Sequence, residues 1–318
     1  MDVYLPIATL SVNGLVIVAL GALTGILSGL FGVGGGFLTT PLLIFYGVPP
    51  TVAAASAASQ VTGASVSGVF AHARHGGVDV RMGTVMVAGG ILGTGIGALL
   101  FRLLERLGQI DTVINILYVL LLGSIGSLMA RESVQALLAE RRGEPLPARR
   151  RRHHPLVASL PMRWRCSARP TANGSIRWRF YKSGLYISPL APLLLGVGTG
   201  ILTMLLGIGG GFVLVPAMLY ILGMSGTVVV GTSLFQILFV TMASTMMHAM
   251  TTRAVDIVLA VLLLIGSVSG AQMGAQFAAR ARPVQLRLAL AVVVLLVAGR
   301  LAWGLGVRPD EIYTVVPL

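Results

Sequence analysis

Apolar residues are grouped along this chain in long, nearly uninterrupted runs. Six segments contain no Asp, Glu or Lys and share a single Arg at position 300: residues 12–31, 82–101, 112–130, 186–206, 257–279 and 288–302. About 20 apolar residues are needed to cross a hydrocarbon layer of roughly 30 Å. The runs are continuous rather than alternating, so they predict membrane-spanning helices and not the strands of a barrel.

The pattern of glycine and polar residues occurs twice. The stretch "FGVGGGFLTTP" at 31–41 is matched by "LGIGGGFVLVP" at 206–216. Further pairs follow at an offset of 175 to 177 residues: Gly25 with Gly200, Ser56 with Thr232, Gln60 with Gln236, Ser65 with Thr241, His72 with His248, Asp79 with Asp256, Gly93 with Gly270, and Gly97 with Gly274. Self-similarity at a fixed offset is the signature of an internal repeat. We therefore predict two homologous halves.

Each half is predicted to contain five helical segments in the same order. In the first half they cover residues 13–31, 36–47, 51–72, 82–102 and 112–130. In the second half they cover 186–206, 211–223, 227–250, 256–279 and 285–305. The second segment of each half is too short to cross a bilayer, so we expect it to form a broken or re-entrant helix with the run before it. The predicted fold is an all-α, polytopic helical membrane protein.

Positive charge is concentrated between the two halves. Residues 131–182 contain 13 Lys and Arg and three Glu, which gives +10 of the formal net charge of +13. Lys and Arg collect on the cytoplasmic side of membrane proteins, whereas a nucleic-acid partner is the weaker interpretation. We divide the chain into a first transmembrane repeat (1–130), a basic cytoplasmic loop or linker (131–185) and a second transmembrane repeat (186–318).

The basic loop also predicts an orientation for the helices. If each short segment counts as a crossing, residues 73–81 and 280–287 lie on the side of the basic loop, and 103–110 and 251–255 lie on the other side. The two halves are then inverted, which is a common plan in secondary transporters. If the short segments do not cross, the same count places 280–287 on the outer side.

Composition agrees with a membrane protein and limits its chemistry. Only 10% of the residues are charged, against about 25% in an average soluble domain. Glycine is used 41 times, roughly twice the usual 7% or so, and small residues let membrane helices approach closely. Most glycines are therefore expected to pack helices. Cys166 is the only cysteine, so no internal disulfide forms.

The two glycine triplets are the first candidate site. Gly34, Gly35 and Gly36, like Gly209, Gly210 and Gly211, interrupt apolar sequence, and each triplet precedes a proline. Glycine allows non-helical backbone, which survives at membrane depth only where protein or water satisfies it. We expect helix breaks whose free N–H groups bind an anion. The alternative is a tight packing contact between helices.

The second candidate site comprises neutral polar residues on the helix that follows each break. They are Ser56 and Gln60 in the first half, and Thr232, Ser233 and Gln236 in the second. Neutral donors suit an anion that must bind and leave. The alternative is hydrogen bonding between helices, which the hydroxyls could equally provide. Gln60 and Gln236 favour a binding role, because a large amide without a partner is costly in an apolar setting.

Histidine, aspartate and methionine give weaker signals. His72 and His248 end matched helices and could gate protons, or could be hydrogen-bonded and silent. Asp79 and Asp256 precede the next helix, where a carboxylate stabilises the N-terminus. Met242, Met246, Met247 and Met250 surround His248 and could bind a soft metal, although the first half has no such methionines. We predict no metal site, no cofactor and no enzymatic activity.

The paired glycine motifs, together with "GTSLFQI" and a helix-ending "HA" in the second half, resemble the TauE/SafE family of membrane proteins. The resemblance covers both halves and leaves out much of the basic insert. It implies transport of sulfite or organosulfonates across a bacterial inner membrane. It also implies about eight spans in two repeated halves. The ten apolar segments agree with that number only if each short one is re-entrant.

The predicted function is a secondary transporter of small anions, with sulfite or organosulfonates as the substrates. Its expected partners are the anion and the lipid bilayer, without nucleic acid. The oligomeric state is left open, and a homodimer is one option. Two alternatives are a membrane scaffold or sensor that acts through its basic loop, and a soft-metal transporter that uses the methionines and His248. The sequence gives neither the direction of transport nor a coupling ion.

Overall fold

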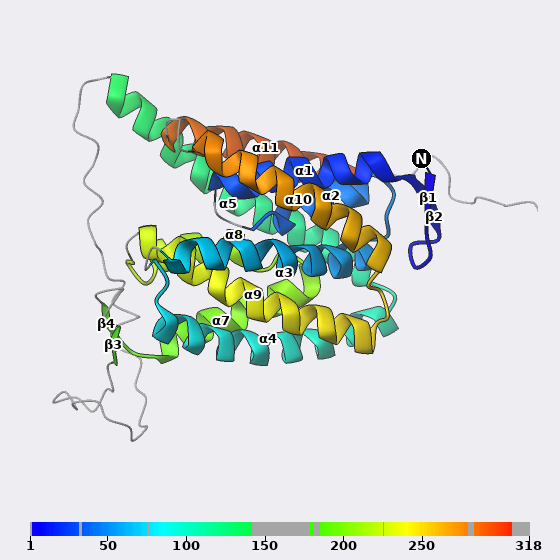
Figure 1. The fold of residues 1–318 in the computed structure, drawn as a ribbon, viewed down its shortest axis with the longest axis horizontal. Coiled ribbons are helices and arrows are strands. Elements are labelled where there is room, and N and C mark those ends of the chain that lie inside the picture. The colour runs from blue at the N-terminus through cyan, green and yellow to red at the C-terminus, as the bar shows by residue number, and fades with distance from the viewer. Residues whose placement is uncertain are drawn as a thin grey trace, which may run out of the picture.

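The structure is a computed structural model, and it describes residues 2–31, 34–74, 77–141, 178–180, 185–224, 226–278 and 283–306. Figure 1 shows a bundle of helices with a short hairpin near each end. The helices are α1 (Gly14–Phe31), α2 (Gly36–Phe45), α3 (Pro50–Arg74), α4 (Val80–Arg106), α5 (Ile110–Arg141), α7 (Leu190–Leu206), α8 (Gly211–Tyr220), α9 (Gly226–Thr251), α10 (Ile257–Ala278) and α11 (Pro283–Gly306). Strand β1 (Asp2–Leu5) pairs antiparallel with β2 (Leu10–Asn13), and β3 (Trp178–Phe180) with β4 (Leu185–Ile187).

The predicted helical segments are all helices, and the chain is mostly helical. The largest difference in bounds is α5, which was expected to end at residue 130 and continues to Arg141. Its last turns, "RESVQALLAER", are rich in good helix formers, so the helix extends past the apolar run at little cost. The predicted helical fold is confirmed, and four strands of three or four residues, too short to give a periodic signal, were not predicted. Residues 142–177 of the predicted basic loop lie outside the described part.

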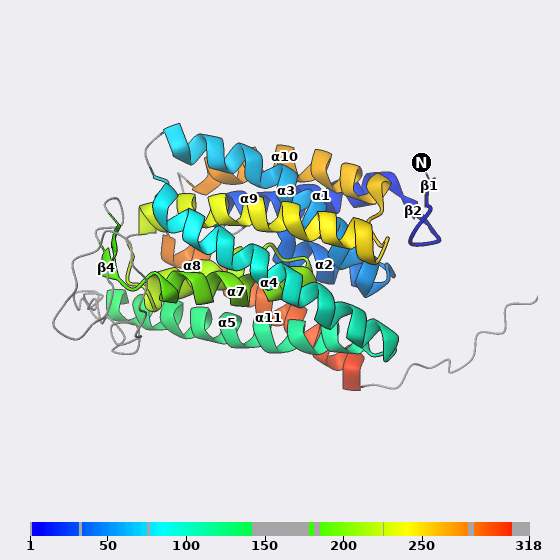
Figure 2. The same ribbon diagram turned by 90° about the horizontal axis from the view of Figure 1, so that it is seen from below.

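The long helices run between two ends of the bundle. In Figures 1 and 2, α5 finishes at the end that carries β3 and β4, and α4, α7, α9 and α11 begin there. The hairpin of β1 and β2 lies at the opposite end. The side of the membrane on which 280–287 lies stays a prediction. Helix α7 starts at the end of the bundle that carries β3 and β4, and α8 finishes at that same end. The chain therefore leaves this pair of helices on the side where it entered, as it would if both helices crossed the whole bundle.

The helices of one half pack mainly on helices of the other. The most extensive contacts join α1 to α10, α4 to α7, α5 to α11, and α3 to α9. Under the predicted repeat, α1 corresponds to α7 and α4 to α10, so the first two pairs are equivalent to each other. The other two pairs each join a helix to its own counterpart. The bundle is therefore held together between the halves rather than within each half.

Glycine makes the closest of these helix contacts. A Cβ added at Gly93 of α4 would lie 2.1 Å from the carbonyl oxygen of Val197 on α7. A Cβ added at Gly270 of α10 would lie 2.1 Å from the carbonyl oxygen of Ala22 on α1. No side chain fits at such distances, and small residues are what membrane helices use to bring their backbones together. The expectation that glycines pack helices is confirmed at these interfaces.

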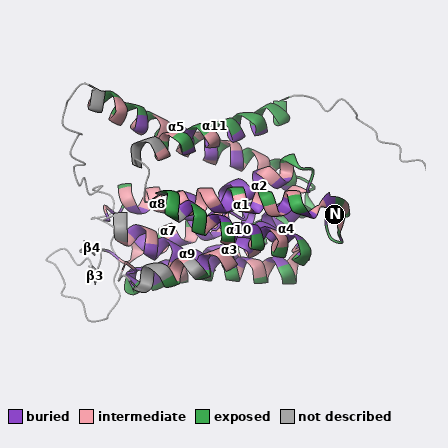
Figure 3. Cartoon of the chain, turned by 45° about the horizontal axis from the view of Figure 1, so that its top comes forward, coloured by how far each residue is buried: buried purple, intermediate pink, exposed green. Residues whose placement is uncertain are grey.

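The outside of the bundle is apolar. In the described part of the chain, five helical segments are long and apolar enough to cross a membrane: Val80–Arg106, Ile110–Ala139, Val228–Thr251, Ile257–Gly274 and Leu286–Gly306. Figure 3 shows exposed residues along α5 and α11, away from the buried centre. Large apolar side chains such as Leu120, Leu296 and Trp303 are more than 60% exposed. A continuous apolar surface of this kind requires lipid around it.

Two glycines that are two residues apart, on different faces of α4, provide a test of the packing. Gly93→Ala must push α4 away from α7, and overpacking of this kind costs about 1–3 kcal/mol. Gly95→Ala is the matched control, because nothing lies within 4 Å of its added Cβ. We expect a lower thermal unfolding temperature in detergent for Gly93→Ala and an unchanged or higher one for Gly95→Ala. Equal temperatures for the two variants would contradict the close contact.

Candidate anion site at two helix breaks

Both predicted helix breaks are present. Helix α1 ends at Phe31 and α2 begins at Gly36, whereas α7 ends at Leu206 and α8 begins at Gly211. The backbone turns through left-handed residues at Gly34 in the first break, and at Gly207, Gly209 and Gly210 in the second. Only glycine adopts this conformation without strain. Gly35 differs, with a φ of −49°, and is needed because its Cβ would lie 2.8 Å from the Thr24 carbonyl oxygen.

Each break exposes the N-terminus of a short helix inside the protein. The N-cap residues are Gly35 for α2 and Gly210 for α8, and a glycine has no side chain with which to cap a helix. The first N–H groups of a helix have no partner in their own helix. Gly34–Gly36 and Gly209–Gly211 are all buried. Each break therefore presents buried donors at the positive end of a helix dipole.

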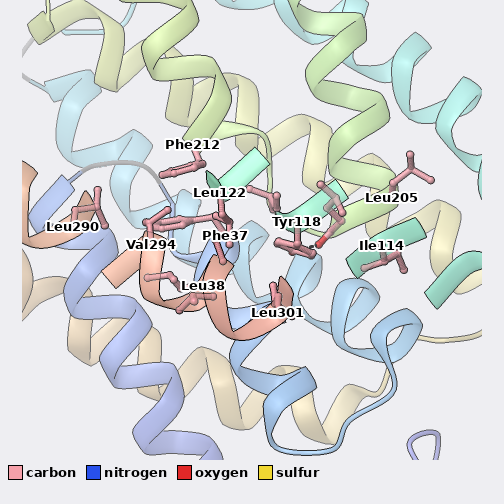
Figure 4. Close-up of a cluster of buried hydrophobic side chains, with 14 of the residues drawn as sticks. Phe37, Leu38, Ile114, Tyr118, Leu122, Leu205, Phe212, Leu290, Val294 and Leu301 are labelled. Atoms are coloured by element: carbon pink, nitrogen blue, oxygen red, sulfur yellow. Dashed lines mark hydrogen bonds between the residues drawn. The ribbon is translucent and has the colours of Figure 1, made fainter. Parts of the chain in front are cut away.

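The two breaks are in contact with each other. A Cβ added at Gly36 would lie 2.9 Å from the carbonyl oxygen of Ile208. Directly after the triplets, the rings of Phe37 and Phe212 stack at 4.5 Å with an interplanar angle of 9°. Figure 4 shows these two rings near the centre of the buried cluster. Phe37 and Phe212 are equivalent positions of the predicted repeat. Their contact shows that the two breaks meet at the centre of the bundle.

Side chains from other helices satisfy carbonyl groups at the end of α7. The Leu206 carbonyl oxygen accepts hydrogen bonds from the Tyr118 hydroxyl at 2.5 Å and the Thr40 hydroxyl at 3.3 Å. The Met204 carbonyl oxygen accepts one from His248 Nε2 at 2.9 Å. Buried carbonyls without such partners would cost free energy comparable to a lost hydrogen bond. The break is therefore held in place by α2, α5 and α9.

His248 is part of this support. Its ring is fully buried, and its centroid lies 5.1 Å from that of Phe101 in an edge-on arrangement. Its Nδ1 atom lies 3.3 Å from the hydroxyl oxygen of Thr252. The bond to the Met204 carbonyl places the proton on Nε2, because a carbonyl oxygen can only accept. These contacts favour the hydrogen-bonded, silent role over gating. The side chain of His72 lies outside the described residues.

Ser56 and Thr232 bind backbone rather than facing an open site. The Ser56 hydroxyl accepts the N–H of Asp256 at 3.1 Å, and the Thr232 hydroxyl accepts the N–H of Asp79 at 3.0 Å. Both aspartates cap the helix that follows, as expected, through Met82 N–H and Leu259 N–H. These equivalent bonds join the halves at opposite ends of the bundle. They favour the interhelical role for the two hydroxyls.

The two glutamines are buried and incompletely satisfied. Gln60 is 1% exposed and Gln236 is fully buried, and the Oε1 atom of each has no hydrogen-bond partner among the described residues. The Nε2 group of Gln236 donates to the Thr199 hydroxyl at 3.2 Å. Ser233 is also buried, and its hydroxyl donates to the Val230 carbonyl oxygen at 2.9 Å. Of the predicted polar residues, the glutamines thus keep unused hydrogen-bonding capacity.

The glutamine helices border the breaks directly. Val61 follows Gln60 in the sequence. A Cβ added at Gly36 would lie 2.6 Å from the Cγ2 atom of Val61. Ile237 follows Gln236 in the sequence. A Cβ added at Gly209 would lie 3.1 Å from the Cγ2 atom of Ile237. The structure therefore brings the two triplets and the α3 and α9 helices together, as the sequence predicted.

The methionines do not converge on His248. Met242, Met246 and Met250 are more than 50% exposed on the outer surface of α9, whereas the His248 ring is buried. Within the described residues, no three His, Cys, Asp or Glu side chains are grouped so as to hold a metal ion.

Three supporting residues were not identified from the sequence. Thr199 lies beneath the second break, and its Cβ would be 3.0 Å from a Cβ added at Gly210. Its counterpart at the repeat offset is Thr24, so the repeat itself held that signal. The sequence indicated Tyr118 and Thr40 more weakly. Each places a hydroxyl inside an apolar run, and a hydroxyl needs a hydrogen-bond partner when it is buried.

The fold defines a multi-pass helical membrane protein with interrupted helices at its centre. The chain belongs to the sulfite exporter TauE/SafE family, whose model matches residues 17–301. It is 27% identical over 279 residues to "Probable membrane transporter protein YjnA" of Bacillus subtilis, covering 88% of this chain and 96% of that protein. It is also 27% identical over 293 residues to a "Probable membrane transporter protein" of Xylella fastidiosa, covering 91% and 95%. No solved structure matches the chain.

The backbone of the second break can be tested through stability. Gly210→Ala places a side chain at a φ of +73°, which costs of order 1–3 kcal/mol. Gly198→Ala, on the helix α7 that leads into the break, serves as the control, because nothing lies within 4 Å of the added Cβ. We expect thermal unfolding of the purified protein to occur at a lower temperature only for Gly210→Ala. Unchanged stability would mean that residue 210 does not adopt the left-handed conformation.

Proposed function

We propose that this protein is a secondary transporter that moves small anions, sulfite or organosulfonates, across the bacterial inner membrane. The observation that carries the proposal is the pair of buried, uncapped helix N-termini that meet at the centre of the bundle. Membership of the TauE/SafE family supports the sulfur-containing substrate. The residues proposed to face the anion are the two glycine triplets with Gln60 and Gln236.

Electrostatics favours an anion at the breaks. Residues 12–71 and 186–252 contain no Lys, Arg, Asp or Glu. Each helix N-terminus carries roughly half a positive charge, and backbone N–H groups there bind anions without further help. Two such ends side by side would attract a small anion. Without a fixed cation, the site would also let that anion leave, as transport requires.

The arrangement of the halves supports alternating access. Discontinuous helices at matching positions of two repeats commonly form the substrate site in secondary transporters. We propose that the halves are inverted homologous repeats and that α1–α2 and α7–α8 re-enter the bilayer from opposite sides. The equivalent pairings of α1 with α10 and α4 with α7 support this proposal.

The two alternative functions have less support. No contact in the described part brings the methionines of α9 to His248, so nothing favours a soft-metal site. A scaffold acting through the basic loop would lose its function when residues 143–176 are deleted. A transporter should retain anion binding after the same deletion.

Uptake into proteoliposomes tests the proposed function. Wild-type protein should carry labelled sulfite or an alkanesulfonate into vesicles faster than empty vesicles do, and an organic cation should not be carried. Gly210→Ala should reduce the rate at equal reconstituted amounts, because it displaces the N-terminus of α8. Gly198→Ala should behave as wild type. Absence of sulfur-anion uptake by wild-type protein, with no anion-dependent stabilisation, would refute the proposal.

The orientation is tested through Cys166, the only thiol. The positive charge of the surrounding loop predicts that it faces the cytoplasm. A membrane-impermeant maleimide should therefore label Cys166 in inverted membrane vesicles and leave it unlabelled in intact cells. The Cys166→Ser variant controls for nonspecific labelling. Labelling in intact cells would reverse the proposed topology.

A further inference from the structure

The unused oxygen of Gln236 suggests a property of the substrate. The orientation of this amide follows from its neighbour Thr199. The Thr199 hydroxyl donates its hydrogen to the carbonyl oxygens of Leu195 and Gly196, at 2.9 and 3.0 Å. Its oxygen can therefore only accept, which assigns the donor group Nε2 of Gln236 to it and leaves Oε1 on the other side. Oε1 is a buried acceptor without a partner among the described residues.

Such an acceptor is costly to leave unsatisfied. Fully buried polar atoms are nearly always hydrogen-bonded, and exceptions call for an explanation such as a missing ligand. The position of this one is informative, because Thr199 also lies against Gly210, the N-cap of α8. The Gln236 amide and the N-cap of α8 therefore both adjoin Thr199.

The first half repeats this arrangement. Gln60 is equally buried, and its Oε1 also lacks a partner among the described residues. Its neighbour Val61 contacts the positions of both Gly36 and Gly209. Two acceptors thus accompany two helix N-termini.

A simple oxyanion without hydrogen cannot use both kinds of group. Its oxygens would accept from the N–H groups, but it has nothing to donate to Oε1. We infer that the site selects monoanions that also carry a hydrogen-bond donor, such as hydrogensulfite or a hydroxyalkanesulfonate. The inference rests on the proposed function, since it assumes that the anion lies at the breaks.

Two sulfonates of equal charge and similar size provide the test. The donor-bearing probe is 2-hydroxyethanesulfonate, and 1-propanesulfonate replaces its hydroxyl by a methyl group. Dissociation constants would be measured by calorimetry on the purified full-length protein in detergent. A net hydrogen bond to Oε1 should make the hydroxyl compound bind roughly three- to tenfold more tightly. A merely apolar pocket would prefer the propane compound.

Variants at glutamine assign the preference to its source. Gln236→Met keeps the length of the side chain and removes the acceptor, so the preference should fall while 1-propanesulfonate still binds. Gln60→Met gives a second, independent variant should the first fail to fold. Gln272→Met is the matched control, because Gln272 is exposed on α10, and it should keep the wild-type preference.

The outcomes separate the two proposals. Equal affinities in wild-type protein, or tighter binding of 1-propanesulfonate, would overturn the inference and leave anion transport intact. An unchanged preference in both Gln236→Met and Gln60→Met would also overturn it, because the donor would then be recognised elsewhere. Failure of both sulfonates to bind wild-type protein would contradict the proposed function itself.

Discussion

The need to satisfy backbone groups inside an apolar environment governs this structure. A continuous helix satisfies its own N–H and C=O groups, and a break exposes several of them at a cost of several kcal/mol each. Here the broken end of α7 is supported by Tyr118, Thr40 and His248, each of which donates to a carbonyl oxygen. The N-cap of α8, Gly210, has no side chain that could bind the first N–H groups of that helix. We propose that an anion takes that place.

Close packing between the halves holds these breaks side by side. Glycines on α1, α4, α7 and α10 let the helix backbones approach until a single added carbon would collide with a carbonyl oxygen. Hydroxyls of Ser56 and Thr232 tie each half to the capping aspartate of the other. The contacts between the halves therefore do two things: they place the breaks side by side, and they link the two ends of the bundle to its centre. Coupled movement of the two halves would require such a link.

Much of this could be predicted from the sequence, for identifiable reasons. Long apolar runs defined the helices, and glycine triplets defined the breaks, because both depend on local sequence. The roles of Ser56 and Thr232 could not be separated, since a hydroxyl accepts equally well from a substrate or from a neighbouring helix. Tyr118 and Thr199 were missed, because their partners lie 88 and 37 residues away and only the fold brings them together. The hairpins were missed because their strands are too short to show a period.

The most direct test of the account is a structure of the protein with a heavy-atom anion bound. Bromomethanesulfonate would mark the site by the anomalous signal of bromine in crystals. The account predicts the sulfonate oxygens at the N-termini of α2 and α8, within hydrogen-bonding distance of the N–H groups of the glycine triplets. Bromine bound only elsewhere, with both helix N-termini free of the sulfonate at saturating concentration, would contradict it.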